Sequence, residues 1–153
     1  AEIYDQPAWP RHPLFYLCCP SKSDDSVAPQ GCENLFFLIP VAPDMTSDDN
    51  TREHYWNLLC ERLKERVGLD IRPHVVYKRS YAHEEFIADY HSYKGNAYGL
   101  ANTLMQTAFL KPKLKSSKLN NLYYCGQLTV PGPGMPPGII SGQLAAKEII
   151  EKN

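Results

Sequence analysis

The sequence lacks the cysteine and histidine spacings of a metal site or a disulfide framework. Its five cysteines are odd in number and contain no C-x-x-C pair, and its five histidines form no H-E-x-x-H motif. Structural zinc needs such closely spaced ligands, and a disulfide framework needs cysteines that can all pair. We therefore expect no bound metal, and we expect reduced thiols, which are typical of the cytoplasm.

Strong charge and long apolar runs are also absent. A net charge of −1 over 153 residues gives no reason to expect nucleic acid as a partner. The lysine-rich run at 113–118 is more typical of a solvated loop than of a binding patch. The longest apolar run, residues 35–42, contains Pro40 and is far too short to span a membrane.

Residues 1–13 carry acids and prolines where a secretory signal needs a basic start and an apolar stretch, and the first residue is not methionine. We expect a processed protein or a piece of a longer one.

Motifs of nucleophilic catalysis are missing as well. The sequence contains no G-x-S-x-G elbow, and the adjacent Cys18 and Cys19 have no base beside them in sequence. His83 precedes Glu84 and Glu85, a pattern that acid–base chemistry could use, but a charge cluster at the start of a helix is the favoured interpretation. The sequence therefore assigns no catalytic residue.

What is present is the composition of an ordinary globular domain, with 43% hydrophobic and 22% charged residues. Apolar runs bounded by turn residues predict strands, and apolar residues at three- and four-residue spacing predict helices. The polar loop between the first two strands suits antiparallel pairing. Asn50 or Thr51 is the expected cap of the first helix, and Gly68 its end. The predicted strands are residues 14–19, 34–39 and 71–77, and the predicted helices are residues 52–67, 84–90 and 102–110.

The stretch from residue 119 to 146 has the order of a cofactor site: a short strand, a rigid loop and a helix. Residues 122–125 are apolar and aromatic, which predicts a buried strand. The loop that follows alternates prolines, which fix φ, with glycines, which accept positive φ. A helix is expected from Pro137 to Glu151, with free amides at its start that face outward with the positive end of the helix dipole.

Small residues line one face of this helix. Gly138, Gly142 and Ala146 recur every four residues, so a second backbone or a flat ligand can approach closely there. Ile139, Ile140, Leu144 and Ile149 are expected to supply its apolar packing. From the residues alone, a cofactor loop and a plain strand–loop–helix corner explain the stretch equally well, because no strict dinucleotide fingerprint is present.

Three separated motifs resemble the phytoene desaturase family, the flavin-dependent enzymes of carotenoid biosynthesis. The segment NLYYCGQLTVPGPGMPPGIISGQLAA is similar to the family's C-terminal signature. FYLCCPSKSDDSVAPQGCENLFFLIPVAP resembles its strand, acidic loop and second strand, and YKGNAYGLANTLMQTAFLKPK resembles the segment before the final strand. The motifs occur in the family's order and cover nearly the whole chain.

The resemblance implies an α/β fold, as the C-terminal part of an amine-oxidase-like FAD flavoprotein. Residues 1–112 would belong to the substrate domain, a mixed or antiparallel sheet with helices. Residues 113–153 would return to the FAD domain as its final strand, loop and helix. The family carries G-x-G-x-x-G near its N-terminus, and this chain has no such motif. Only the C-terminal portion of the family is therefore represented.

Carried over position by position, the resemblance implies a set of FAD-contacting residues in the loop and at the start of the last helix. Some positions depart from the family's pattern. Leu128 and Pro137 stand where glycines are usual, and Val130 stands where a histidine is common. The implied FAD-binding residues are Gly126, Thr129, Pro131, Gly132, Gly134, Met135 and Pro136.

The activity implied by the resemblance is FAD-dependent removal of hydrogen from a polyene, with hydride transfer to the flavin. In such enzymes the cofactor performs the reaction and the protein orients the substrate. A lipophilic carotenoid substrate implies peripheral membrane contact of a cytoplasmic parent protein. Two alternatives stay open: a related carotenoid isomerase, saturase or oxygenase, and a non-catalytic domain whose Pro/Gly loop binds a partner protein.

Overall fold

The computed structural model describes residues 3, 5–101, 103–106 and 110–152. It contains helices and one two-stranded antiparallel sheet, so both element types of the expected α/β class are present. The chain divides into two compact units, Ala1–Asn96 and Ala97–Asn153, which are described separately. The predicted division of the parent into domains at residues 112 and 113 stays a prediction.

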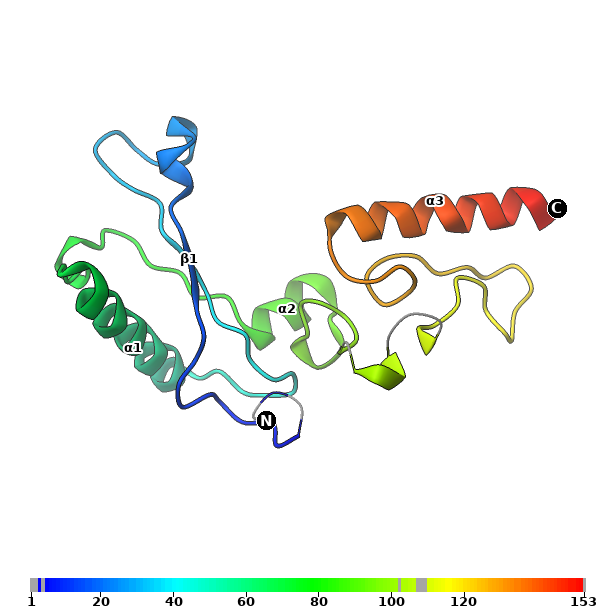
Figure 1. The fold of residues 1–153 in the computed structure, drawn as a ribbon, viewed down its shortest axis with the longest axis horizontal. Coiled ribbons are helices and arrows are strands. Elements are labelled where there is room, and N and C mark those ends of the chain that lie inside the picture. The colour runs from blue at the N-terminus through cyan, green and yellow to red at the C-terminus, as the bar shows by residue number, and fades with distance from the viewer. Residues whose placement is uncertain (1–2, 4, 102, 107–109, 153) are drawn as a thin grey trace. The chain divides into compact units, whose positions relative to one another are not determined.

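The first unit begins with a β-hairpin (Figure 1). Strand β1, Tyr16–Cys18, pairs antiparallel with β2, Phe36–Leu38, so the predicted pairing is confirmed. Both strands are shorter than predicted. Pro20 and Pro40 follow them closely, and a proline cannot donate to a strand ladder.

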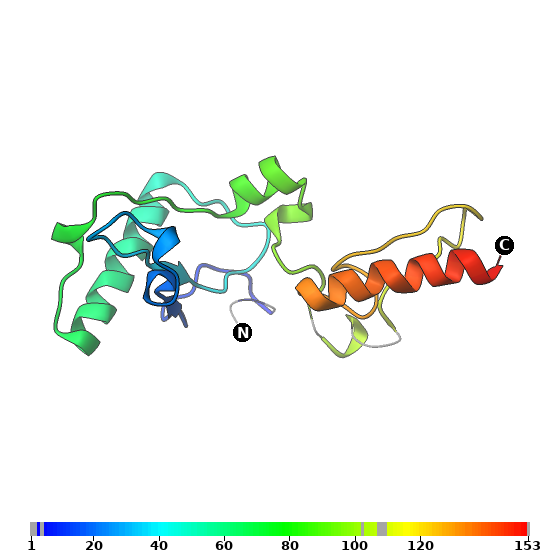
Figure 2. The same ribbon diagram turned by 90° about the horizontal axis from the view of Figure 1, so that it is seen from above.

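Helix α1, Asp49–Val67, is the longest element of the first unit (Figure 2). The expected cap at Asn50 or Thr51 is wrong, because the Asp48 side chain caps the helix by accepting a hydrogen bond of 2.8 Å from the Thr51 amide. The helix ends at Gly68 as predicted, in the left-handed conformation with φ of +75°. The buried face of α1 consists of Tyr55, Leu59, Cys60 and Leu63.

Helix α2, His83–Tyr90, confirms the second predicted helix and begins one residue earlier. The strand predicted at residues 71–77 is wrong. Arg72–His74 forms a 3-10 turn, and the Val76 and Tyr77 side chains are 87% and 78% exposed. Pro73 lacks an amide hydrogen for a ladder, and β-forming side chains do not make a strand without a neighbouring strand to pair with.

In the second unit, helix α3, Met135–Lys152, confirms the predicted C-terminal helix and begins two residues earlier (Figure 1). The buried strand predicted at residues 122–125 is wrong. Tyr123 forms only an isolated antiparallel bridge with Lys115, and Tyr124 is exposed. Within the range predicted as a helix, residues 102–110, the structure describes a 3-10 turn at Leu104–Gln106, and residues 102 and 107–109 lie outside the described residues.

The apolar side chains of α3 are another correction. Ile139 and Ile140 were expected to pack, yet they are 67% and 43% exposed. The buried face of α3 instead contains Ser141 and Ala145, at 0% and 7% exposure. A helix with a narrow buried face of small residues approaches its neighbours closely and leaves its larger side chains outside. Among the described residues, no helix has the length and apolar character needed to cross a membrane.

Candidate cofactor loop

The loop before α3 is closed at its base by one turn. The Thr129 amide and hydroxyl both donate to the Gly126 carbonyl, at 3.2 Å and 2.9 Å. Thr129 is only 3% exposed. Its hydroxyl hydrogen is therefore used inside the loop, and the contribution of Thr129 is to hold the loop's shape.

Ser141 connects this turn to α3. Its hydroxyl accepts a hydrogen bond of 2.7 Å from the Gly126 amide and donates one of 2.6 Å to the Gly138 carbonyl. The side chain is completely buried, so both bonds are made away from water. Sequence reasoning missed Ser141. The available signal was a hydroxyl residue inside a helix, where serine often bonds back to the preceding turn.

Gly126 leaves open space in front of its backbone. Its φ is +105°, which L side chains rarely adopt, and no atom lies within 4 Å of the position that a Cβ would take. Pro131, Gly134, Met135 and Pro136 are exposed, and Met135 is 86% exposed. These residues leave the surface accessible to a ligand from the turn at Gly126 to the start of α3.

Gly132 faces inward. It is buried, its φ is +135°, and the space where its Cβ would lie is taken by the Lys111 ammonium group. Lys111 is itself only 8% exposed. The positive φ favours a glycine at 132, and a side chain there would also force the flexible Lys111 side chain to move. The burial of Lys111 was not predicted, because the surrounding sequence indicates a solvated, lysine-rich segment.

The start of α3 offers fewer amides than expected. Because the helix begins at Met135, both Pro136 and Pro137 fall in its first turn, where the amides normally have no partner inside the helix. Proline has no amide hydrogen, and the Gly138 amide already donates to the Gly134 carbonyl at 2.9 Å. The amides of Gly134 and Met135 are those that the first turn can offer to a ligand.

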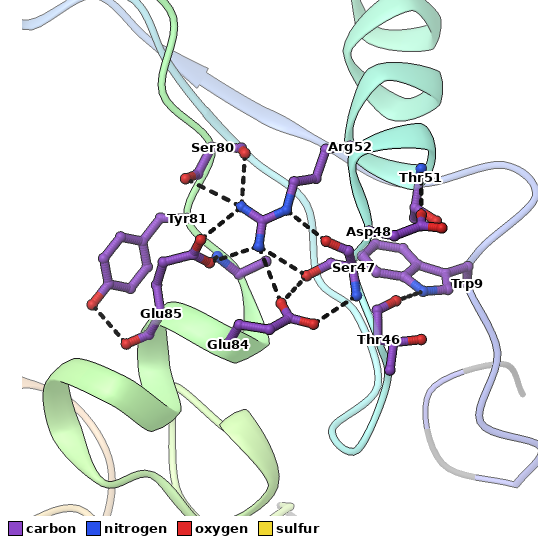
Figure 3. A network of polar contacts seen from close by, with 11 residues as sticks. Trp9, Thr46, Ser47, Asp48, Thr51, Arg52, Ser80, Tyr81, Glu84 and Glu85 are labelled. Atoms are coloured by element: carbon purple, nitrogen blue, oxygen red, sulfur yellow. Dashed lines mark hydrogen bonds and ion pairs between the residues drawn. The ribbon is translucent and has the colours of Figure 1, made fainter.

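A second polar centre lies in the first unit, around the guanidinium group of Arg52 (Figure 3). It donates to the Ser47 carbonyl at 2.6 Å, to the Ser80 hydroxyl at 2.9 Å, and to the carboxylates of Glu84 and Glu85 at 3.1 Å and 2.9 Å. The Arg52 side chain is 18% exposed. This centre joins the start of α1 to the start of α2 and to the segment before α2.

The electrostatics of this centre favour a structural role. Hydrogen bonds from the Ser47 hydroxyl and amide lower the pKa of Glu84 to about 2. The hydrogen bond from Arg52 lowers the pKa of Glu85, which also accepts a 2.7 Å hydrogen bond from the Ala82 amide. Carboxylates held in the ionised form by such bonds are poor general acids near neutral pH.

His83, beside these carboxylates, is also committed to packing. It is 4% exposed, and its Nε2 lies 2.7 Å from the Ala42 carbonyl oxygen. Its ring contacts the Trp9 ring edge to face, with centroids 5.8 Å apart. These contacts give His83 a packing role, and the charges at this helix start are those of Glu84 and Glu85, which pair with Arg52. Among the described residues, no group of three His, Cys, Asp or Glu side chains is arranged to hold a metal ion.

Comparison with known proteins identifies relatives over nearly the whole chain, although no family model matches it. The chain is 44% identical over 150 residues to carotenoid 3,4-desaturase of Haloarcula japonica, covering 98% of this chain and 30% of that protein. The resemblance inferred from the motifs is thereby confirmed. The chain belongs to the carotenoid desaturase family. It is also 34% identical over 142 residues to 4,4'-diapolycopene oxygenase of Methylomonas sp, covering 90% of this chain and 28% of that protein.

A third relative is also named as a desaturase. The chain is 30% identical over 146 residues to 4,4'-diapophytoene desaturase (4,4'-diaponeurosporene-forming) of Staphylococcus aureus, covering 91% of this chain and 29% of that protein. The chain thus spans about 30% of the length of the curated relatives it matches. What those whole proteins do is therefore a matter of proposal for this chain.

Proposed function

We propose that this chain is the C-terminal portion of an FAD-dependent enzyme that desaturates a carotenoid-like polyene. The observation that carries the proposal is the match of nearly the whole chain to proteins named as carotenoid and diapophytoene desaturases. The parent would have the amine-oxidase-like flavoprotein fold. Residues 1–112 would contribute to its substrate domain and residues 113–153 to its FAD domain.

The loop geometry supports a flavin contact. The open space at Gly126 and the exposed ridge of Pro131, Gly134, Met135 and Pro136 would admit a flat ring system. Thr129 and Gly132 would act from inside, by fixing the loop's path. The amides of Gly134 and Met135 lie at the positive end of the helix dipole. A negatively charged group placed there would be stabilised by about 0.3 to 1 kcal/mol. When bound, FAD would supply the hydride acceptor, and the chain's residues would orient it and keep its surroundings apolar.

The cellular location that we propose for the parent protein follows from its proposed substrate. A polyene is lipophilic, so peripheral membrane contact of a cytoplasmic enzyme is part of the proposal. Peripheral contact needs no spanning helix, because an enzyme can take its substrate from the membrane surface.

The deciding experiment uses the full-length gene product. It is incubated with FAD and phytoene, and the extracted pigments are separated and their absorption spectra recorded. We expect new polyenes that absorb at longer wavelength, because each desaturation extends the conjugated system. Bound flavin without any change in the pigments would contradict desaturation of phytoene.

A second candidate activity is oxygenation of a polyene. It is favoured by the 34% identity to 4,4'-diapolycopene oxygenase. Mass spectrometry of the same extracts separates the two activities, because desaturation lowers the product mass by pairs of hydrogens and oxygenation raises it.

The chain by itself is expected to lose the cofactor. Gel filtration of residues 1–153 after incubation with FAD should give protein without flavin absorbance, because the sequence has no G-x-G-x-x-G loop to hold the pyrophosphate. A stoichiometric flavin spectrum in the protein peak would show that this expectation is wrong. A full-length product that also fails to retain FAD would instead argue against the proposed flavoenzyme.

A further inference from the structure

The second unit contains a small, open cavity, and three of its six lining residues are lysines. Its volume is about 270 Å³. The Pro/Gly loop contributes Val130, α3 contributes Glu148, and the rest of the lining comes from the segment just after residue 110. The lining residues are Lys111, Lys113, Leu114, Lys115, Val130 and Glu148.

Lys111 is the unusual member of this lining. The residue is 8% exposed, and among the described residues its ammonium group makes no hydrogen bond or ion pair. Lysine is rarely buried to this extent unless it is paired, and here its ammonium group is not sealed from solvent. Gly132, which has no side chain, leaves the space that this ammonium occupies. The fold thus places a cation without an ion-pair partner, but with access to solvent, in the wall of the cavity.

The other lysines come from a hairpin-like segment that is held in place by backbone bonds. Lys115 forms an antiparallel bridge with Tyr123, and the Tyr124 amide donates to the Leu114 carbonyl at 2.7 Å. The Lys115 ammonium lies 5.6 Å from the centre of the Tyr123 ring, so it is also positioned by a cation–π contact. Lys113 is exposed. The cavity therefore combines one buried and two more accessible cations.

Glu148 is the one acidic residue of the lining, against three lysines. The positive charge exceeds what one carboxylate can neutralise. A ligand with more than one negative charge would balance the excess better than a single carboxylate would, and lysine is a common partner of phosphate. The cavity is smaller than the roughly 300 to 1,000 Å³ of typical small-molecule sites, so it suits one charged group better than a whole dinucleotide.

We propose that this cavity is a phosphate-binding site, with Lys111 as its central cation and Lys113 and Lys115 at its margin. The apolar walls formed by Leu114 and Val130 allow the phosphate to be carried by a lipid headgroup or by a free phosphate compound. The site does not depend on the proposed desaturase activity, because binding is measured without flavin or polyene.

The test uses the whole 153-residue chain and two probes. Pyrophosphate binding is measured by isothermal titration calorimetry. Lipid binding is measured by sedimentation with phosphatidylcholine vesicles that contain or lack phosphatidic acid. The central variant is Lys111→Met, which keeps the length of the side chain and removes its charge. The matched control is Lys118→Met, in the same lysine-rich run but outside the cavity lining. Circular dichroism checks that each variant is folded.

We expect Lys111→Met to weaken pyrophosphate binding roughly tenfold or more, as expected for the loss of a hydrogen bond between charged groups. Lys118→Met should bind as the natural chain does. The ligand is assigned as a lipid headgroup if two results are found together. Lys111→Met must also lose binding to phosphatidic acid vesicles, and pyrophosphate must compete with those vesicles for the natural chain. Binding of pyrophosphate without vesicle binding assigns a free phosphate compound.

Three results would overturn the site. The first is the absence of binding to both probes. The second is equal binding by Lys111→Met and the natural chain. The third is an equal loss in Lys111→Met and Lys118→Met, which would mean that the general charge of the segment attracts anions. Should Lys111→Met fail to fold, Lys113→Met is used in its place, because this lysine is exposed and also lines the cavity.

Discussion

Each of the two units is held together internally by a different kind of interaction. In the first unit, the charged Arg52 side chain is bonded to groups from Ser47 to Glu85, which lie up to 33 positions away in sequence. In the second unit, the base of the loop is fastened by neutral groups, the hydroxyls of Thr129 and Ser141 and the backbone of Gly126. The first arrangement depends on ionisation, and the second depends on the absence of side chains at glycines.

This difference bears on function. A ligand loop that must keep its shape while charge develops on a bound group benefits from fixed neutral dipoles, which do not change their ionisation. A junction between helices that lies outside the loop can use charges that respond to pH. The contrast therefore predicts which substitutions and which conditions affect each unit.

The largest expected effect is in the loop. Gly132→Ala places a Cβ where the Lys111 ammonium lies and forces a side chain into a φ of +135°. We expect it to lower the free energy of unfolding of the second unit by up to about 3 kcal/mol, mainly through the strained backbone, because the flexible Lys111 side chain can move aside. Chemical denaturation followed by circular dichroism measures the change. Gly138→Ala is the control, because no atom lies within 4 Å of its Cβ position, and it should stabilise α3 by about 0.5 to 1 kcal/mol. Equal effects of the two substitutions would contradict this account.

A smaller loss is expected in the first unit from Arg52→Met. It removes the shared donor of Glu84 and Glu85 and should cost about 2 kcal/mol, a typical value for a hydrogen bond to a charged group. Both tryptophans of the sequence, Trp9 and Trp56, lie in the first unit, so their fluorescence reports its unfolding. Arg66→Met, at an exposed position near the end of α1, should change the midpoint far less. An unchanged midpoint for Arg52→Met would show that the network contributes no stability.

The smallest effect is expected from pH. The folded-state pKa of Glu84 is about 2, below the roughly 4.3 of a free glutamate, so its stabilisation is complete above pH 4.3 and is lost as the pH falls towards 2. Hydrogen bonding from Arg72 likewise lowers the pKa of Asp70 to about 2, in the same unit. Because Glu84 is half exposed, its share should stay within about 1 kcal/mol.

Tryptophan fluorescence during acid titration follows the first unit, and hydrogen exchange at the Gly126 amide follows the second. The Glu84→Gln variant should show a shallower pH dependence, and an identical dependence would argue against its role.

Helices α1, α2 and α3 were predictable because their signals are local. Periodic apolar positions indicated α1, Gly68 marked its end, and the paired prolines marked the start of α3 within two residues. The strand predicted at residues 71–77 failed for the opposite reason. Strand formation depends on a partner segment, and residue propensity alone does not supply one.

The candidate site shows the same division. The Pro/Gly loop and its likeness to the carotenoid desaturases were visible in the sequence, because motif order is a property of the chain alone. Ser141 and Lys111 were not. A buried serine and a buried lysine look like ordinary surface residues until the partners that surround them are known.

The sequence by itself determined the family, helices α1, α2 and α3 and the position of the loop, since each rests on neighbouring residues. Only the tertiary structure decided which side of the loop is open at Gly126 and which is filled at Gly132. It also decided that Arg52 is the centre of a polar network. Burial, counter-charge and free space arise between segments that are distant in sequence, and no local pattern specifies them.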